Sequence, residues 1–172
     1  TYPTMSEEII ALASELLAGN SNWKNATVES TEHLAGDASG RRYTRLNLSN
    51  APAPTAVLAQ LVKRQGPPAA GRTDFNQDDT FVLLAAFLRY HDIAVPEIIS
   101  DRRDLAALLL EDVGDSALWR FALDQPTPEM KDIAPPAAED LTLALYCRAA
   151  DVIIDLQRIL PDAKCPAFKR SL

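Results

Sequence analysis

Segments with the composition of β-strands occupy only residues 27–110, and every later segment has a helical pattern. The strand-like segments are 27–35, 41–48, 55–62, 96–100 and 105–110, with a helical run at 78–90 between the third and the fourth. The longest helical pattern, residues 139–160, follows them. Strands gathered first and helices gathered later are typical of an α+β fold. We therefore expect a sheet-based lobe over residues 1–110, joined to a helical part over residues 111–172.

The first two strand-like segments are joined by the turn-prone sequence Gly36-Asp37-Ala38-Ser39-Gly40, which predicts a β-hairpin. Because the side-chain period of a strand is two, the second strand has two faces. One carries Arg42, Thr44, Leu46 and Leu48, and the other carries Arg41, Tyr43, Arg45 and Asn47. Helix 78–90 is apolar nearly all round, so it is expected to pack on several sides. These patterns predict one antiparallel sheet of five strands with that helix against one face.

The hairpin turn has the composition of an anion-binding loop. Its two glycines and small side chains allow backbone N–H groups to approach a phosphate closely. Ser39 adds a hydroxyl, and Arg41 or Arg42 could add positive charge. The alternative is an ordinary hairpin, in which glycine and aspartate serve only the geometry of the turn.

The apolar segment 105–110 ends abruptly in Glu111-Asp112-Val113-Gly114-Asp115. A strand that ends in a short acidic connector before helices has the form of a hinge between two lobes. Backbone groups of such a hinge can bind the edge of an adenine, while leucines sandwich its ring. The alternative is a strand that is followed by a solvated acidic loop.

Taken in order, three stretches resemble the aminoglycoside phosphotransferase and choline kinase superfamily. They are Leu34-Ala-Gly-Asp-Ala-Ser-Gly-Arg-Arg-Tyr-Thr-Arg45, then Val95-Pro96-Glu97-Ile98 after the helix with Phe81 and Leu88, and finally Leu109-Leu-Glu-Asp-Val-Gly-Asp115. The first is most similar to the bacterial branch whose kinases phosphorylate the anomeric hydroxyl of N-acetylmuramate and N-acetylglucosamine. The resemblance covers nearly all of the chain. It implies a protein-kinase-like fold, with a small lobe, a hinge and an incomplete helical large lobe.

The resemblance also implies an ATP site. Its expected residues are the loop Asp37, Ala38, Ser39, Gly40, Arg41 and Arg42 and the hinge Leu110, Glu111, Asp112 and Val113. Kinases of this type hold the α- and β-phosphates with a lysine on the third strand, paired with a glutamate on the next helix. Residues 56–61 contain no lysine, so Lys63 and Arg42 are both candidates for this cation. Helix 78–90 contains acids only at Asp78 and Asp79.

The His-Gly-Asp catalytic motif of this superfamily does not occur in the chain, because neither His33 nor His91 precedes a Gly-Asp pair. We therefore assign no catalytic residue and no metal ligand here, and expect the ligands of Mg²⁺ outside this chain. The sequence is interpreted as a truncation, a cut domain or a degenerate copy. In the case of a truncation, the apolar face of residues 139–160, with Leu141, Leu145, Ile153 and Leu156, should be unusually exposed or paired with another chain.

The expected function is ATP-dependent phosphoryl transfer to a hydroxyl of a small molecule, with an amino sugar suggested by the most similar branch. The alternative is a pseudokinase-like module that binds nucleotide without catalysis. A net charge of −7 argues against a nucleic-acid partner. We expect a cytoplasmic protein, because no apolar run reaches the roughly 18–20 residues that span a membrane. No signal peptide is evident, and Cys147 and Cys165 lack metal-ligand spacing.

Overall fold

The computed structural model describes residues 5–35, 40–62, 77–115, 117–118 and 135–159. The chain divides into two compact units, one of Thr1–Ala86 with Val95–Asp112, and one of Phe87–Ala94 with Val113–Leu172. The first unit contains the β-sheet and the second contains the long helix α4 (Pro135–Ile159).

The first unit is built on one five-stranded sheet, and every neighbouring pair of strands is antiparallel. The strand order is β1-β2-β3-β5-β4, so the last strand in sequence lies between the third and the fourth. The predicted α+β class and five-stranded antiparallel sheet are therefore confirmed. The strands are β1 (Thr27–Leu34), β2 (Arg42–Ser49), β3 (Thr55–Gln60), β4 (Ile98–Arg102) and β5 (Ala107–Glu111).

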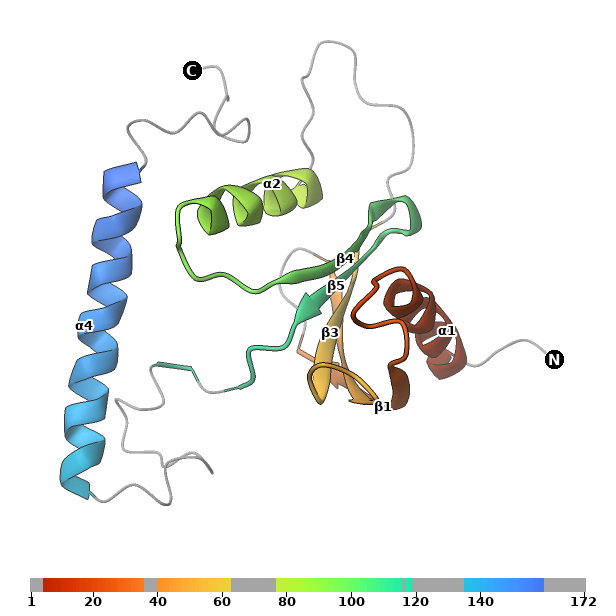
Figure 1. Ribbon diagram of the computed structural model, residues 1–172, viewed down its shortest axis with the longest axis horizontal. Coiled ribbons are helices and arrows are strands. Elements are labelled where there is room, and N and C mark those ends of the chain that lie inside the picture. Colours follow the sequence, from red (N-terminus) through yellow and green to blue (C-terminus); the bar gives the residue numbers. More distant parts are fainter. Residues whose placement is uncertain (1–4, 36–39, 63–76, 116, 119–134, 160–172) are drawn as a thin grey trace, which may run out of the picture. The chain divides into compact units, whose positions relative to one another are not determined.

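A helix lies against each face of this sheet (Figure 1). Helix α1 (Met5–Ala18) buries Ala13, Leu16 and Leu17 against one face, in a core cluster that also contains Leu46 of β2. Helix α2 (Gln77–Tyr90) packs Phe81 and Val82 on the other face. Leu46 and Tyr43 of β2 belong to these two different clusters, which confirms the predicted alternation of β2. We call the two sides the α1 face and the α2 face.

Many of the buried side chains lie where β3 pairs with β5. Leu58 and Leu109 are paired across these strands, and both are completely buried on the α1 face. Ala59 and Leu108, the next pair, are 2% and 1% exposed and belong to the α2 face. Two strands that are buried on both sides need nearly continuous apolar sequence, which residues 56–59 and 107–110 have.

The edge strand β1 contains a bulge between Val28 and Ser30. Val28 lies opposite Leu48, yet after the bulge His33 lies opposite Thr44. One extra residue changes which side chains of a strand face each side of the sheet. Because of the bulge, Val28 and His33 share the α1 face, although their positions differ by five and would lie on opposite faces in a regular strand.

The turn between β4 and β5 differs from the sequence-based expectation in its boundaries. Strand-like patterns predicted strands at 96–100 and 105–110, but a 3-10 turn occupies Arg103–Leu105. Ala106 then adopts a left-handed backbone conformation with φ of 55°. The carboxylates of Asp101 and Asp104 accept hydrogen bonds from the neighbouring arginines, which stabilises this tight turn, and β5 begins after it at Ala107.

The described part of the second unit consists mainly of α4. This helix begins at Pro135, earlier than the predicted residue 139, because proline is tolerated in the first turn of a helix. Ile153 is 56% exposed, while Leu145 and Leu156 are half-buried. The side chain of Leu141 lies outside the described residues. Among the described helices, none combines the length and the apolar character needed to cross a bilayer.

The β3–β5 core yields a first prediction. Changing Leu58 to Ala should lower the free energy of unfolding by about 3 kcal/mol, because the lost contacts leave a cavity between the sheet and α1. Val62, which is 61% exposed, provides the control, and Val62→Ala should cost less than about 0.5 kcal/mol. Urea denaturation followed by circular dichroism measures both. Equal losses for the two variants would contradict the assignment of Leu58 to the core.

Candidate functional site

Part of the expected phosphate loop can be located. Asp37, Ala38 and Ser39 lie outside the described residues, as does Lys63. Gly40 is described and has a φ of +77°, a conformation that side chains rarely adopt. A Cβ atom at this position would lie 3.3 Å from Cγ2 of Val62. The backbone at the end of the turn therefore favours glycine on both conformational and steric grounds.

Arg41, the next residue, is held by an ion pair to α2. Its Nη2 and Nε atoms lie 2.6 and 3.0 Å from Oδ1 of Asp78, in the first turn of that helix. The side chains are only 9% and 19% exposed. The guanidinium carbon also lies 5.6 Å from the centre of the Phe81 ring, within the range of a cation–π contact. Arg41 thus presents a fixed positive charge on the α2 face, next to Gly40.

Two opposing effects act on the pKa of Arg41. Burial lowers it, but hydrogen bonds to Tyr43 and Asp78 and the negative charge of Asp78 outweigh this effect. The net result is a pKa above the ordinary value for arginine. The side chain therefore stays cationic despite being largely withdrawn from water.

A second arginine holds the same turn of α2. Nη1 of Arg103 is paired with Oδ1 of Asp79, and Nη2 of Arg103 lies 2.8 Å from Oδ2 of Asp101. Arg103 follows β4, whereas Arg41 precedes β2. The first turn of α2 is consequently tied to the sheet at two places that are distant in sequence. Asp78 and Asp79, the only acids of the helix, both take part.

Arg42 is on the other side of the sheet. It begins β2 and lines a cleft on the α1 face together with Thr44 and Gln60. Arg41 and Arg42 were both expected to serve the phosphate loop, but the structure places their side chains on opposite faces. Only Arg41 shares a face with α2, because neighbouring residues of a strand point to opposite sides.

The expected hinge residues have different surroundings. Leu110 is 8% exposed and belongs to the cluster on the α2 face. The N–H group of Glu111 donates to the carbonyl of Glu97, and the Glu111 carboxylate accepts from the N–H group of Glu97. Glu111 thereby fastens the segment that enters β4. Val113 is 69% exposed.

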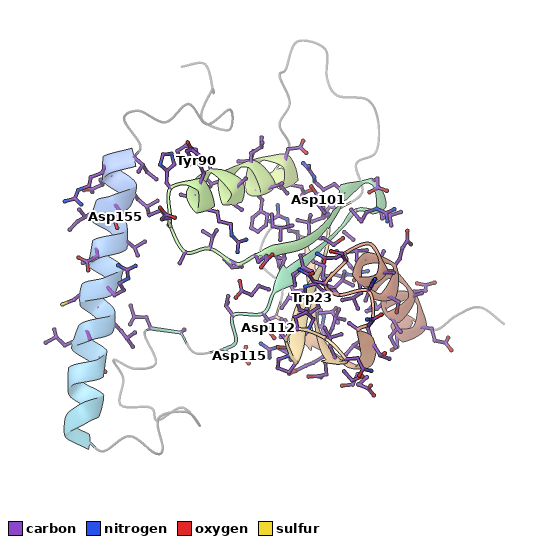
Figure 2. The ribbon with its side chains drawn as sticks, viewed as in Figure 1. Trp23, Tyr90, Asp101, Asp112, Asp115 and Asp155 are labelled. Atoms are coloured by element: carbon purple, nitrogen blue, oxygen red, sulfur yellow. The ribbon has the colours of Figure 1, made fainter. Side chains whose placement is uncertain are left out.

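The carboxylate of Asp112 is a structural anchor. Nε and Nη2 of Arg45 donate to its two oxygens at 2.6 and 3.2 Å. The two side chains are 12% and 6% exposed, and Glu32 lies 3.7 Å from Nη1 of Arg45. A bidentate pair of this kind fixes both partners in position. Figure 2 shows Asp112 where the chain leaves β5.

Of the residues expected in the nucleotide site, Arg41 and Leu110 lie on the α2 face, whereas Arg42 lies on the α1 face. Arg41 contacts Phe81, and Phe81 packs on the cluster that includes Leu110. The sequence placed Arg45 on the same side of β2 as Arg41, but Asp78, Phe81 and Arg45 were not among the residues expected in the site. The signal for Arg45 was present, since an arginine on the inward side of a central strand requires a carboxylate partner.

No group of three or more metal-binding side chains occurs among the described residues. No protein-family model matches the chain, and no curated protein matches it significantly in sequence.

The Arg45–Asp112 pair yields a second prediction. Changing Asp112 to Ala should lower the free energy of unfolding by about 3 kcal/mol, because it leaves the guanidinium of Arg45 buried without its main partner. The control is Asp155→Ala, which breaks the exposed pair with Arg158 and should cost less than about 1 kcal/mol.

The double variant Arg45→Met with Asp112→Leu extends this test. It removes both charges and should recover much of the stability that Asp112→Ala loses. Urea denaturation of all the variants is the measurement. A loss for Asp112→Ala no larger than that of the control would show that the pair contributes little to the fold.

Proposed function

We propose that the chain provides the nucleotide-binding part of an ATP-dependent phosphotransferase that acts on a hydroxyl of a small molecule. The Arg41–Asp78 ion pair carries this proposal. It holds a cation beside the glycine at the end of the hairpin turn and links that cation to the helix after β3. In kinases, a cation that meets the phosphates is likewise held by an acid on the helix after the third strand.

The assignment of roles follows from this arrangement. Backbone N–H groups of the hairpin turn would bind the phosphates, and Arg41 would neutralise part of their charge. Leu110 on the α2 face would contact the adenine, while Asp112 would keep the connector against β2. ATP supplies the phosphoryl group, and the part of the enzyme that holds Mg²⁺ and the acceptor lies elsewhere. An amino sugar is the proposed acceptor class, on the resemblance of residues 36–43.

A second candidate is a nucleotide-binding regulatory module without catalysis. One observation favours it: β3 carries no lysine. Formation of ADP by the full-length protein in the presence of N-acetylglucosamine or N-acetylmuramate would support the kinase. Binding of ATP without any ADP formation would support the module.

The cation provides a third prediction. Arg41→Ala should weaken ATP binding by about 1.5–3 kcal/mol, the usual contribution of a charge-assisted hydrogen bond. Asp78→Asn keeps the arginine and should therefore weaken binding less. Calorimetric titration with ATP and Mg²⁺ measures both, with Arg158→Ala as a control for the loss of one exposed charge.

The outcomes of this titration are distinct. A larger effect of Arg42→Ala than of Arg41→Ala would place the phosphates on the α1 face. If the Arg41→Ala variant bound ATP as tightly as the wild type, the Arg41–Asp78 ion pair would have only a structural role.

Gly40 provides a fourth prediction. Gly40→Val should weaken ATP binding at least about tenfold, since a side chain would obstruct the close approach of backbone to phosphate. Both Gly40 and Gly114 have a positive φ, but a Cβ atom at Gly114 would meet nothing within 4 Å. Gly114→Val is therefore a control for backbone strain. If the two variants bind ATP equally, the hairpin turn is an ordinary one.

A further inference from the structure

A cleft of about 540 Å³ opens on the α1 face, on the opposite side of the sheet from α2. This volume lies within the usual range of small-molecule pockets, roughly 300–1,000 Å³. The N-terminal part of α1 and the first three strands form its walls. Its lining residues are Glu8, Ile9, His33, Arg42, Thr44 and Gln60.

The register of the sheet determines this set of side chains. His33 lies directly opposite Thr44, and Arg42 lies directly opposite Gln60. Residues that are directly opposite in an antiparallel pair share a face of the sheet. The bulge in β1 is needed for this arrangement, because it turns His33 toward the α1 face. The cleft is thus built from paired positions in the sheet.

Thr44 is the deepest polar residue of the cleft. It is only 3% exposed, and its hydroxyl has no hydrogen-bond partner within the described part of the chain. A buried hydroxyl without a partner is unfavourable, so such groups are usually satisfied by another residue, water or a ligand. The hydroxyl of Thr44 therefore offers a hydrogen bond to a molecule that enters the cleft.

Two opposite charges face the same cleft. Glu8 comes from α1 and Arg42 from β2, and they do not form an ion pair with each other. Neither of them forms one with any other residue that the structure describes. A guanidinium prefers a carboxylate, with which it can form two parallel hydrogen bonds. A carboxylate such as Glu8 prefers an ammonium group or another donor.

We propose that this cleft is a binding site for a small zwitterion of the amino-acid type. Its carboxylate binds Arg42, its ammonium group binds Glu8, and Thr44 and Gln60 contact its remaining polar atoms. A ligand with both charges satisfies both walls, whereas a polyanion such as ATP would meet the negative charge of Glu8. The site lies on the opposite face from the proposed nucleotide site, so its test does not depend on that proposal.

The test is an NMR titration of the ¹⁵N-labelled full chain with single L-amino acids, up to concentrations of about 10 mM because small ligands bind weakly. We expect at least one of them to shift the amide signals of His33 and Thr44. Its N-acetyl derivative lacks the ammonium group, and its amide lacks the carboxylate. Both should bind at least about tenfold more weakly. Absence of shifts at these residues with every amino acid would overturn the proposal.

Substitutions make the test specific. Thr44→Val keeps the shape of the side chain and removes a buried hydroxyl without a partner, so the variant should unfold at a higher temperature than the wild type. It should nevertheless bind the amino acid more weakly. Thr55→Val on the α2 face, at the start of β3, controls for the change of side chain. Unchanged binding by Thr44→Val would contradict the proposed contact.

Two further variants test the contributions of Glu8 and Arg42 separately. Glu8→Gln should lower the affinity for the free amino acid. It should leave the affinity for the N-acetyl derivative unchanged, because that derivative makes no ion pair with Glu8. Arg42→Gln should lower the affinity for the free amino acid but leave the affinity for its amide unchanged, because the amide has no carboxylate to bind Arg42. If each variant lowered the affinity for all three molecules equally, Glu8 and Arg42 would not be the residues that bind the ammonium group and the carboxylate.

Discussion

The pairing of β3 with β5 determines which side chains each face of the sheet presents to its helix. Leu58 and Leu109 belong to the core cluster on the α1 face, while Ala59 and Leu108 belong to the cluster on the α2 face. A shift of the register by one residue would exchange these faces and expose every core side chain to the wrong helix. The positions of Leu110 and of the residues that follow it depend on the same register. The candidate sites are therefore consequences of how the core is paired.

The arginines of the β2 region show how one strand can serve two surfaces. Arg41 and Arg45 point to the α2 face, and each is neutralised by an aspartate from another element. Arg42 points to the α1 face, where the structure shows an open cleft. Buried guanidinium groups need such partners, because the desolvation of a lone charge is costly. The difference in partners gives the two faces different chemistry, with fixed charges on one side and accessible charges on the other.

Much of the sheet could be predicted from local sequence. The alternation of β2 is visible in residues 42–48, and the hairpin is marked by its glycines. What could not be predicted depends on tertiary placement. The bulge at Val28–Ser30 has no glycine or proline to indicate it, and Ala106 takes a left-handed conformation that its residue type does not suggest. Which aspartate meets which arginine also depends on elements that lie far apart in the chain, such as Arg45 and Asp112.

The order of the strands has a consequence for how the chain reaches this structure. Strands β1, β2 and β3 form a meander of neighbouring hairpins, which can close as soon as they are synthesised. The free edge of β3, however, is filled by β5, whose residues are made considerably later than those of β3. Until then, an apolar strand edge is open to other chains. Asp112 directly follows β5, so Arg45 gains its partner in the same late step. Completion of the sheet and neutralisation of its inward arginine are thus expected to be a single event in folding, and chains interrupted before residue 107 would be prone to association.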